Sequence, residues 1–171
     1  MDERFSRGWD NAMIIKGLVD EDFVNYKEPC MYICSSKCSF KCDDENGGDY
    51  CQNSSLALTE NMNIDDNIII ERYLNNPITK AICISGLEPF DQIDEVLKFI
   101  DLLRNKYKND DMVVIYSGYN KNEITAFEEV LKQYKNIIVK YGRYVPGERK
   151  HKDPVLGVKL ASWNQYAEQI S

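Results

Sequence analysis

The sequence has little histidine and no long apolar segment: its 171 residues include one histidine, and no run approaches the about 20 apolar residues that a membrane-spanning helix needs. We therefore expect no membrane partner. The first twelve residues are charged and lack the apolar core of a signal peptide, which favours a cytoplasmic protein. The lone His151 excludes sites built from several histidines.

Positive charge is also scarce, because 21 Lys and Arg stand against 28 Asp and Glu, for a net charge of −7. A nucleic-acid surface gathers Lys and Arg, so we expect no nucleic-acid partner. The length suits one domain with a real hydrophobic core. We assign residues 13–171 to that domain and residues 1–12 to an N-terminal extension.

Cysteine, in contrast, is plentiful: five of the six cysteines fall within residues 30–51. Disulfides are rare in a reducing compartment, so this grouping indicates metal or iron–sulfur ligation. Cys83 lies in an apolar run and Cys30 directly precedes one, so we predict both as core residues. The other four are candidate ligands: Cys34, Cys38, Cys42 and Cys51.

Apolar runs that read as strands alternate with amphipathic helical patterns. The predicted strands are 13–19, 31–33, 81–84, 112–116, 136–141 and 156–160, and the predicted helices are 65–75, 91–107 and one that begins after Asn120. This order predicts an α/β fold, a partial (βα) barrel-like, mostly parallel open sheet with helices on its outer face. Right-handed crossovers bring the carboxyl ends of the strands to one edge, where such sheets bind ligands.

Two helices carry specific predictions about their termini and buried sides. Asp65 or Asp66 caps the first helix, and Asn120 with Glu123 forms a capping box for the last one. The inward side chains we expect are Ile68, Ile69 and Tyr73 in the first helix and Ile124, Phe127, Val130, Leu131 and Tyr134 in the last.

The cysteine-rich segment 34–55 is predicted as a loop, because sulfurs that converge on one small cluster cannot come from a regular strand or helix. Cys38-Ser-Phe-Lys-Cys42 has a C-x-x-x-C spacing, and Cys51 follows Tyr50 and precedes Gln52-Asn53. Here the chain resembles the radical-SAM superfamily, and within it the anaerobic ribonucleotide reductase activating enzymes. Eight residues separate Cys42 from Cys51 where that family has two.

The resemblance implies a [4Fe–4S] cluster held by Cys38, Cys42 and Cys51. Two other sets stay open: Cys34 with Cys38 and Cys42, or Cys34 with Cys38 and Cys51. Three cysteines leave one iron of the cube without a protein ligand. In the family, S-adenosylmethionine occupies that iron through its amino and carboxylate groups.

Further segments resemble the family in the same order along residues 13–168. The run Ser85-Gly86-Leu87-Glu88-Pro89 is similar to its Gly-Gly-Glu-Pro motif, and Ser117-Gly118 lies in a segment similar to its Tyr-Thr-Gly-Tyr turn. Near the C-terminus, 142–144 and 161–165 are similar to two further segments, although Asn164 and Gln165 could instead cap a terminal helix. The cofactor-binding residues that the resemblance implies are Ser85, Gly86, Leu87, Glu88, Pro89, Ser117, Gly118 and Asn53.

By this resemblance the protein is a radical-SAM oxidoreductase that cleaves S-adenosylmethionine reductively. Its product radical would take a hydrogen atom from a glycine of a partner glycyl-radical enzyme such as anaerobic ribonucleotide reductase. The electron donor would be a flavodoxin or a ferredoxin. Two other functions stay open: a radical-SAM enzyme that acts on a small molecule, such as a deazapurine precursor, and a non-catalytic interaction module stabilised by zinc, which prefers C-x-x-C pairs that are missing here.

Overall fold

The computed structural model describes residues 12–171. Most of the predicted N-terminal extension, residues 1–11, lies outside the described residues, and Ala12 already belongs to the first strand. Within the described part of the chain, no helix has the length and apolar character needed to cross a membrane.

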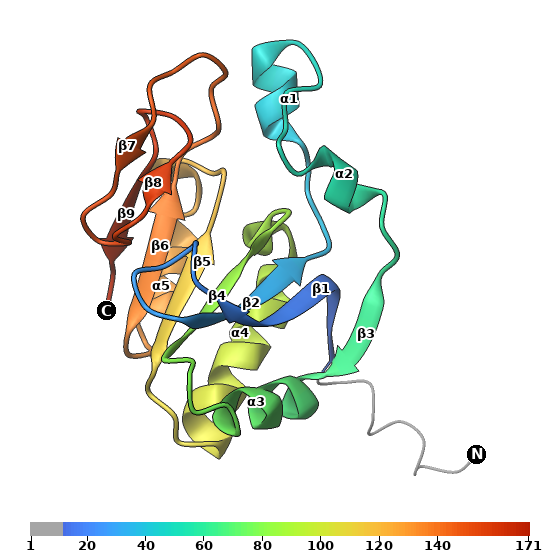
Figure 1. The fold of residues 1–171 in the computed structure, drawn as a ribbon, viewed down its shortest axis with the longest axis vertical. Helices are drawn as coiled ribbons and strands as arrows, with labels where there is room; N and C mark the ends of the chain where they lie inside the picture. Colours follow the sequence, from blue (N-terminus) through green and yellow to red (C-terminus); the bar gives the residue numbers. More distant parts are fainter. Residues whose placement is uncertain (1–11) are drawn as a thin grey trace.

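The centre of the fold is a seven-stranded sheet in the order β3-β1-β2-β4-β5-β6-β9 (Figure 1). Its four central strands are parallel: β2 (Cys30–Ser35), β4 (Ala81–Gly86), β5 (Met112–Tyr116) and β6 (Ile137–Tyr141). The flanking strands are antiparallel to their neighbours: β1 (Ala12–Asp22), β3 (Met62–Asp65) and β9 (Tyr166–Gln169). The predicted mixed α/β fold with a mostly parallel sheet is therefore confirmed, and the described strands form no closed barrel.

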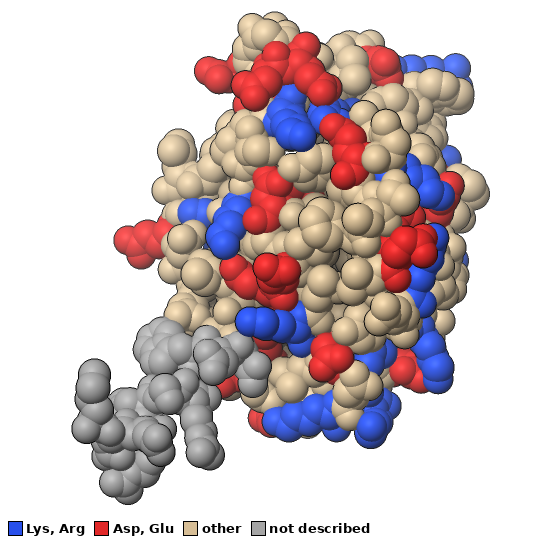
Figure 2. Space-filling view, turned by 180° about the vertical axis from the view of Figure 1, so that it is seen from behind, with Lys and Arg blue, Asp and Glu red and all other residues tan. Residues whose placement is uncertain are grey.

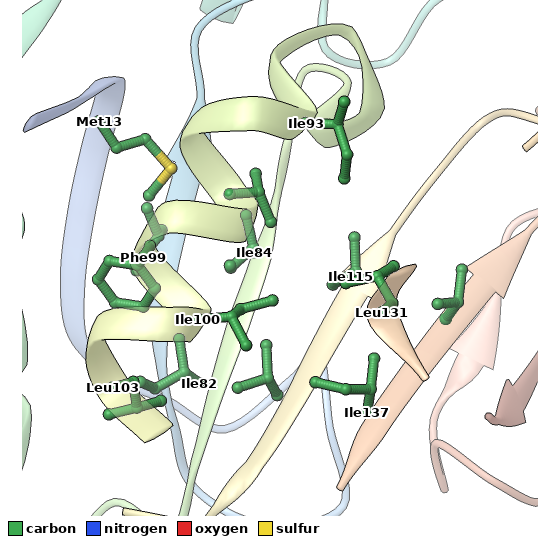
Figure 3. Packing of buried hydrophobic residues seen from close by; sticks show 14 of the residues in the cluster. Met13, Ile82, Ile84, Ile93, Phe99, Ile100, Leu103, Ile115, Leu131 and Ile137 are labelled. Atoms are coloured by element: carbon green, nitrogen blue, oxygen red, sulfur yellow. The ribbon is translucent and has the colours of Figure 1, made fainter. Parts of the chain in front are cut away.

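One face of the sheet packs against helices α3 (Asp66–Leu74), α4 (Ile93–Asp101) and α5 (Thr125–Leu131). Helix α4 continues into one π-helical turn, Leu102–Lys106. Its Phe99, Ile100 and Leu103 are fully buried against Ile82 and Ile84 of β4 (Figure 3). The continuous apolar runs of β4 and β5 are explained by this double-sided burial, which parallel strands require.

The opposite face of the sheet is covered by irregular chain and a small second sheet, β7 (His151–Lys152) with β8 (Lys159–Leu160). Cys30 and Cys83 are both fully buried in this second core, beside Leu156. Their predicted place in the core is confirmed.

The predicted helix faces are partly wrong. Asp65 caps α3 as expected by accepting from the Asn67 N–H at 2.8 Å, but Ile68 is 59% exposed and Ile70 is buried instead. At the last helix the predicted capping box is confirmed, although it opens the 3₁₀ turn Lys121–Glu123. Helix α5 is short and ends at Leu131, so few of its side chains face the sheet. Two residues that we expected in the core, Phe127 and Val130, are each 38% exposed.

The C-terminal prediction also needs correction, because the chain ends in the antiparallel strand β9 and not in a helix. Gln165 caps no helix; its Oε1 accepts from the N–H groups of Ala161 and Ser162, each at 3.1 Å. Asn164 donates from Nδ2 to the Arg143 carbonyl at 2.7 Å. These amides fix the turn that brings β9 back to the sheet edge.

Charge on the face seen in Figure 2 is mixed, with Lys and Arg interspersed among Asp and Glu. Acidic side chains gather at the upper end, where α1 (Lys41–Asn46) projects above the sheet in Figure 1. This helix carries Asp43, Asp44 and Glu45.

Candidate functional site

A cavity of about 290 Å³ opens at the carboxyl ends of the parallel strands, the edge that the topology predicts for ligand binding. Nearly all the predicted site residues line it, and Pro89 lies outside the lining. The lining includes Cys38, Cys42, Cys51, Asn53, Ser85, Gly86, Leu87, Glu88, Ser117 and Gly118. Segments far apart in the sequence therefore meet at one place.

The start of the cysteine segment is fixed by the 3₁₀ turn that follows β4, Pro89–Gln92. Gln92 Oε1 accepts from the N–H groups of Ser36 at 2.7 Å and Lys37 at 3.2 Å. Asp91 accepts from the Ser39 N–H at 2.6 Å, and the Glu88 N–H donates to the Lys37 carbonyl at 2.7 Å. Backbone groups of an irregular segment thus obtain the partners that a strand or helix would provide.

Phe40 turns the chain between the first two cysteines that line the cavity. Its φ of 53° lies in the left-handed region, which is uncommon for a bulky residue. In this conformation the Phe40 N–H donates to Cys38 Sγ at 3.2 Å, and α1 begins at the next residue. The predicted loop 34–55 is therefore wrong in part, because Cys42 lies on the first turn of α1.

Cys51 is positioned by hydrogen bonds with Asp43, near the start of the segment that separates it from Cys42, and with Asn53, just after Cys51. Asp43 Oδ1 accepts from the N–H groups of Tyr50 and Cys51 at 2.8 and 2.7 Å. The Asn53 N–H lies 3.4 Å from Cys51 Sγ, and Asn53 Nδ2 donates to the Gly86 carbonyl at 2.6 Å. A second short helix, α2 (Ser54–Ala57), follows. The eight-residue spacing therefore forms a folded excursion that returns Cys51 to the cavity.

The thiols of Cys38, Cys42 and Cys51 are close enough to influence one another. Burial raises the pKa of Cys38 to about 12, and the nearby Cys51 contributes to the rise. Burial likewise raises the pKa of Cys42, where the backbone of Tyr144 opposes the rise and Cys51 adds to it. Without a cation Cys38 and Cys42 are therefore thiols, and binding iron would have to displace their protons.

Cys34 lies apart from this group and does not line the cavity. It pairs with Gly17 of β1, and a Cβ on Gly17 would meet Cys34 Sγ at 3.6 Å. Burial raises the pKa of Cys34 to about 11, with Asp22 as the second cause. The cysteine set that the structure gathers at the cavity is thus Cys38, Cys42 and Cys51.

The turn after β4 depends on a glycine. Gly86 has a φ of +89°, which L side chains rarely adopt. A Cβ there would lie 3.0 Å from Cys34 Cα and 3.2 Å from the Leu56 side chain. This close approach lets the cysteine segment cross directly over the strand end.

Glu88 joins two of the predicted motifs. Its Oε1 accepts from the Phe90 N–H at 3.0 Å and the Ser117 hydroxyl at 2.9 Å, and its Oε2 accepts from the Gly118 N–H at 2.7 Å. The side chain is 5% exposed, and burial raises its pKa to about 7. Glu88 therefore positions the turn after β5 as well as facing the cavity.

Lys140 is a lining residue that the sequence analysis missed. It lies on β6 and is 6% exposed, and its Nζ donates to the carbonyls of Ser117 at 3.1 Å and Gly142 at 2.9 Å. Burial lowers its pKa to about 8. A usable signal was present, since Lys140 is the one charged residue in an otherwise apolar strand at its carboxyl end.

Arg143 ties α1 to the rest of the molecule. Its guanidinium binds both carboxylate oxygens of Glu123, each at 2.6 Å, and its Nε lies 2.9 Å from Glu45 Oε1. Arg143 is 5% exposed, and this bidentate geometry is the strongest form of such a pair. The arginine thereby holds the cysteine-bearing helix α1 near the end of β6.

A family model for the 4Fe-4S single cluster domain matches residues 30–165, most of the chain. The chain belongs to this family. Comparison with curated proteins and with solved structures finds no match. The matched span includes all the cysteines that line the cavity and the strand-end turns around them.

The donor set fits the cluster of this family. Cysteine thiolates are the usual ligands of a four-iron cluster, and three of them face one cavity next to two N–H groups directed at sulfur. Among residues 12–171, no three His, Cys, Asp or Glu side chains lie close enough together to hold a single metal ion. Structural zinc sites favour paired C-x-x-C elements, and the sequence contains none.

Proposed function

We propose that this chain is a radical-SAM activating enzyme that generates a glycyl radical on a partner protein. The observation that carries the proposal is the meeting of three thiols from residues 38–51 with the turns 85–88 and 117–118 at one cavity. Those are the segments whose sequence resembles the superfamily, and the family match supports the 4Fe–4S part of the proposal independently.

Cys38, Cys42 and Cys51 would hold the cluster, which supplies the electron that splits S-adenosylmethionine into methionine and a 5′-deoxyadenosyl radical. The residues of the chain would bind S-adenosylmethionine and orient it toward the cluster. Ser85 and Gly86 line the cavity, and Asn53 fixes the Gly86 carbonyl.

Glu88 is the acidic group available to an ammonium in this cavity. A carboxylate pairs well with a substrate amino group, and burial strengthens the pair. Its two oxygens already accept three hydrogen bonds, so its position is set before a ligand arrives. Preorganised polar groups of this kind orient a ligand without further ordering cost.

The size of the cavity favours a protein substrate. At about 290 Å³ it lies at the lower end of ligand pockets, which run from about 300 to 1,000 Å³. Cluster and cofactor would use that space, and a second small molecule would have to compete with them. A glycine on the loop of a partner glycyl-radical enzyme, such as anaerobic ribonucleotide reductase, reaches the site from solvent. A flavodoxin or ferredoxin would deliver the electron.

The test is anaerobic iron–sulfur reconstitution of the full chain and of single Cys→Ala variants. We expect C38A, C42A and C51A to lose most of the bound iron and sulfide, and dithionite-dependent formation of 5′-deoxyadenosine with them. C34A is the matched control, because Cys34 is close in sequence and does not line the cavity. It should keep both properties.

Full cluster loading without cleavage of S-adenosylmethionine would reject the radical proposal and leave a plain iron–sulfur protein. Cleavage without a glycyl-radical signal in the partner, read by electron paramagnetic resonance, would favour a small-molecule substrate instead. Stoichiometric zinc with no sulfide would favour the interaction module.

A further inference from the structure

Lys140 brings a positive charge into the wall of the cavity without a matching anion in contact. An ammonium has three N–H donors, and two of them go to the carbonyls of Ser117 and Gly142. No carboxylate of the described residues lies within 4.0 Å of its Nζ. A buried charge without a close partner is costly, so its presence in a cavity wall points to a negative group in the cavity.

The other charged groups near the cavity are engaged or exposed. Arg143 is paired with Glu123 and Glu45. Glu88 accepts three hydrogen bonds at the end of β4, and its charge acts on Lys140 without a contact within 4.0 Å. Lys159 also lines the cavity but is exposed to solvent. Lys140 is thus the buried cation of the wall that has no carboxylate in contact.

Lys140 lines the cavity from β6, and Cys42 lines the same cavity from α1. A reduced cluster carries one more negative charge than an oxidised one. A nearby positive charge therefore stabilises the reduced cluster more than the oxidised cluster. Net charge near the cluster is one of the features that sets the reduction potential of iron–sulfur proteins.

We infer that Lys140 is a positioning residue for electron transfer, whose buried ammonium raises the reduction potential of a cluster bound by Cys38, Cys42 and Cys51. The inference rests on the proposed cluster site. A residue of β6 would thus help to determine how low the reduction potential of the electron donor has to be. Because the site excludes most solvent around Lys140, its charge acts with little screening.

The test is a redox titration of the anaerobically reconstituted full chain, followed by the electron paramagnetic resonance signal of the reduced cluster. At the ambient potential where half of the wild-type cluster is reduced, we expect Lys140→Met to lower the ratio of reduced to oxidised cluster about tenfold. For one electron this corresponds to a midpoint about 59 mV more negative. Lys140→Arg, which keeps the charge, should stay within about twofold of wild type.

Lys152→Met is the matched control, because Lys152 lies on β7, is exposed to solvent and does not line the cavity. Its removal should leave the midpoint unchanged. If Lys140→Met fails to fold, Lys140→Gln retains a donor for the two carbonyls and must show the same shift. Iron and sulfide content of each variant is measured first.

Full cluster loading of Lys140→Met or Lys140→Gln with a wild-type midpoint would overturn the inference. An unchanged midpoint together with weaker binding of S-adenosylmethionine would overturn it in favour of a contact with the cofactor. If wild type itself takes up no iron and sulfide, the proposed function is wrong and the inference falls with it. The first two outcomes leave the proposed function intact, so the two failures are distinguishable.

Discussion

At the scale of single residues, Gly86 decides whether the cysteine segment can cross the end of β4. We expect Gly86→Ala to destabilise the protein by about 1–3 kcal/mol, the usual cost of a strained backbone position, because its Cβ would press on the Cys34 backbone at 3.0 Å. Urea denaturation measures the change. Gly47→Ala is the control: Gly47 also has a positive φ, +72°, but a Cβ there meets nothing within 4 Å. An equal loss in both variants would contradict the role given to the close approach.

The ion pair of Arg143 with Glu123 predicts a dependence on pH. Arg143 holds the pKa of Glu123 down to about 2, below its ordinary value of 4.5. The pair therefore contributes fully above about pH 4.5 and is lost as the pH falls toward 2. We expect Glu123→Gln to cost about 0.5–1 kcal/mol at pH 7, since Glu123 is partly exposed.

The difference between wild type and Glu123→Gln should shrink steadily below pH 4.5, as measured by urea denaturation at a series of pH values. Glu129→Gln serves as the control, because Glu129 pairs on the surface with Lys132 three residues away. Its cost should be smaller at every pH. A Glu123→Gln penalty that stays constant from pH 7 to pH 3 would show that charge is not its source.

At the scale of elements, the 3₁₀ turn Pro89–Gln92 acts as the support of the cysteine segment. Gln92 is 4% exposed, and its Oε1 serves two backbone N–H groups as well as the Ser36 hydroxyl. Gln92→Ala leaves those donors without a partner, which costs about 1–3 kcal/mol. We expect faster amide hydrogen exchange at residues 36–39 and weaker retention of the cluster. Exchange that accelerates equally along β5 would instead indicate a general loss of packing.

Elements dominated by one periodic signal could be predicted from the sequence, and those shaped by tertiary contacts could not. The strand 112–116 was predicted with its observed bounds, because a short apolar run rich in β-branched residues is typical of a buried strand. β9 was missed, since Tyr166–Gln169 is polar and forms a strand only through its pairing with β6. Helices α1 and α2 were also missed, because none of their residues is buried and no apolar periodicity marks them in the sequence.

The candidate site was predictable to a similar degree. Residues in local motifs, such as Cys38, Cys42 and Glu88, were predicted from the grouping of the cysteines and from the resemblance of their segments to a known family. Lys140 and Gln92 were missed, because their roles arise from segments that meet only in the folded chain. The choice against Cys34 likewise needed the sheet register, which directs its sulfur toward Gly17.

At the scale of the whole molecule, stability is unevenly distributed. The sheet and helices α3 and α4 share one continuous core, whereas residues 36–57 contribute no side chain to it. Segments with few buried apolar contacts open more readily than a core. Figure 1 shows α1 and α2 standing above the strand ends, joined to the sheet by a few hydrogen bonds and one arginine. The proposed cluster would therefore be the main cross-link of this segment.

This division leads to a prediction for removal of the cluster. Chelation of iron under anaerobic conditions should increase hydrogen exchange and proteolysis within residues 36–57, while β4, β5 and β6 keep their protection. A bound group stabilises the folded state to which it binds. Here the stabilisation would fall on the segment that supplies the cysteine ligands. Peptide-resolved exchange compares loaded and chelated protein, and C51A treated in the same way is the control that should show no further change. Equal loss of protection in the sheet would mean that the core itself depends on the metal, as it does in small zinc-folded domains.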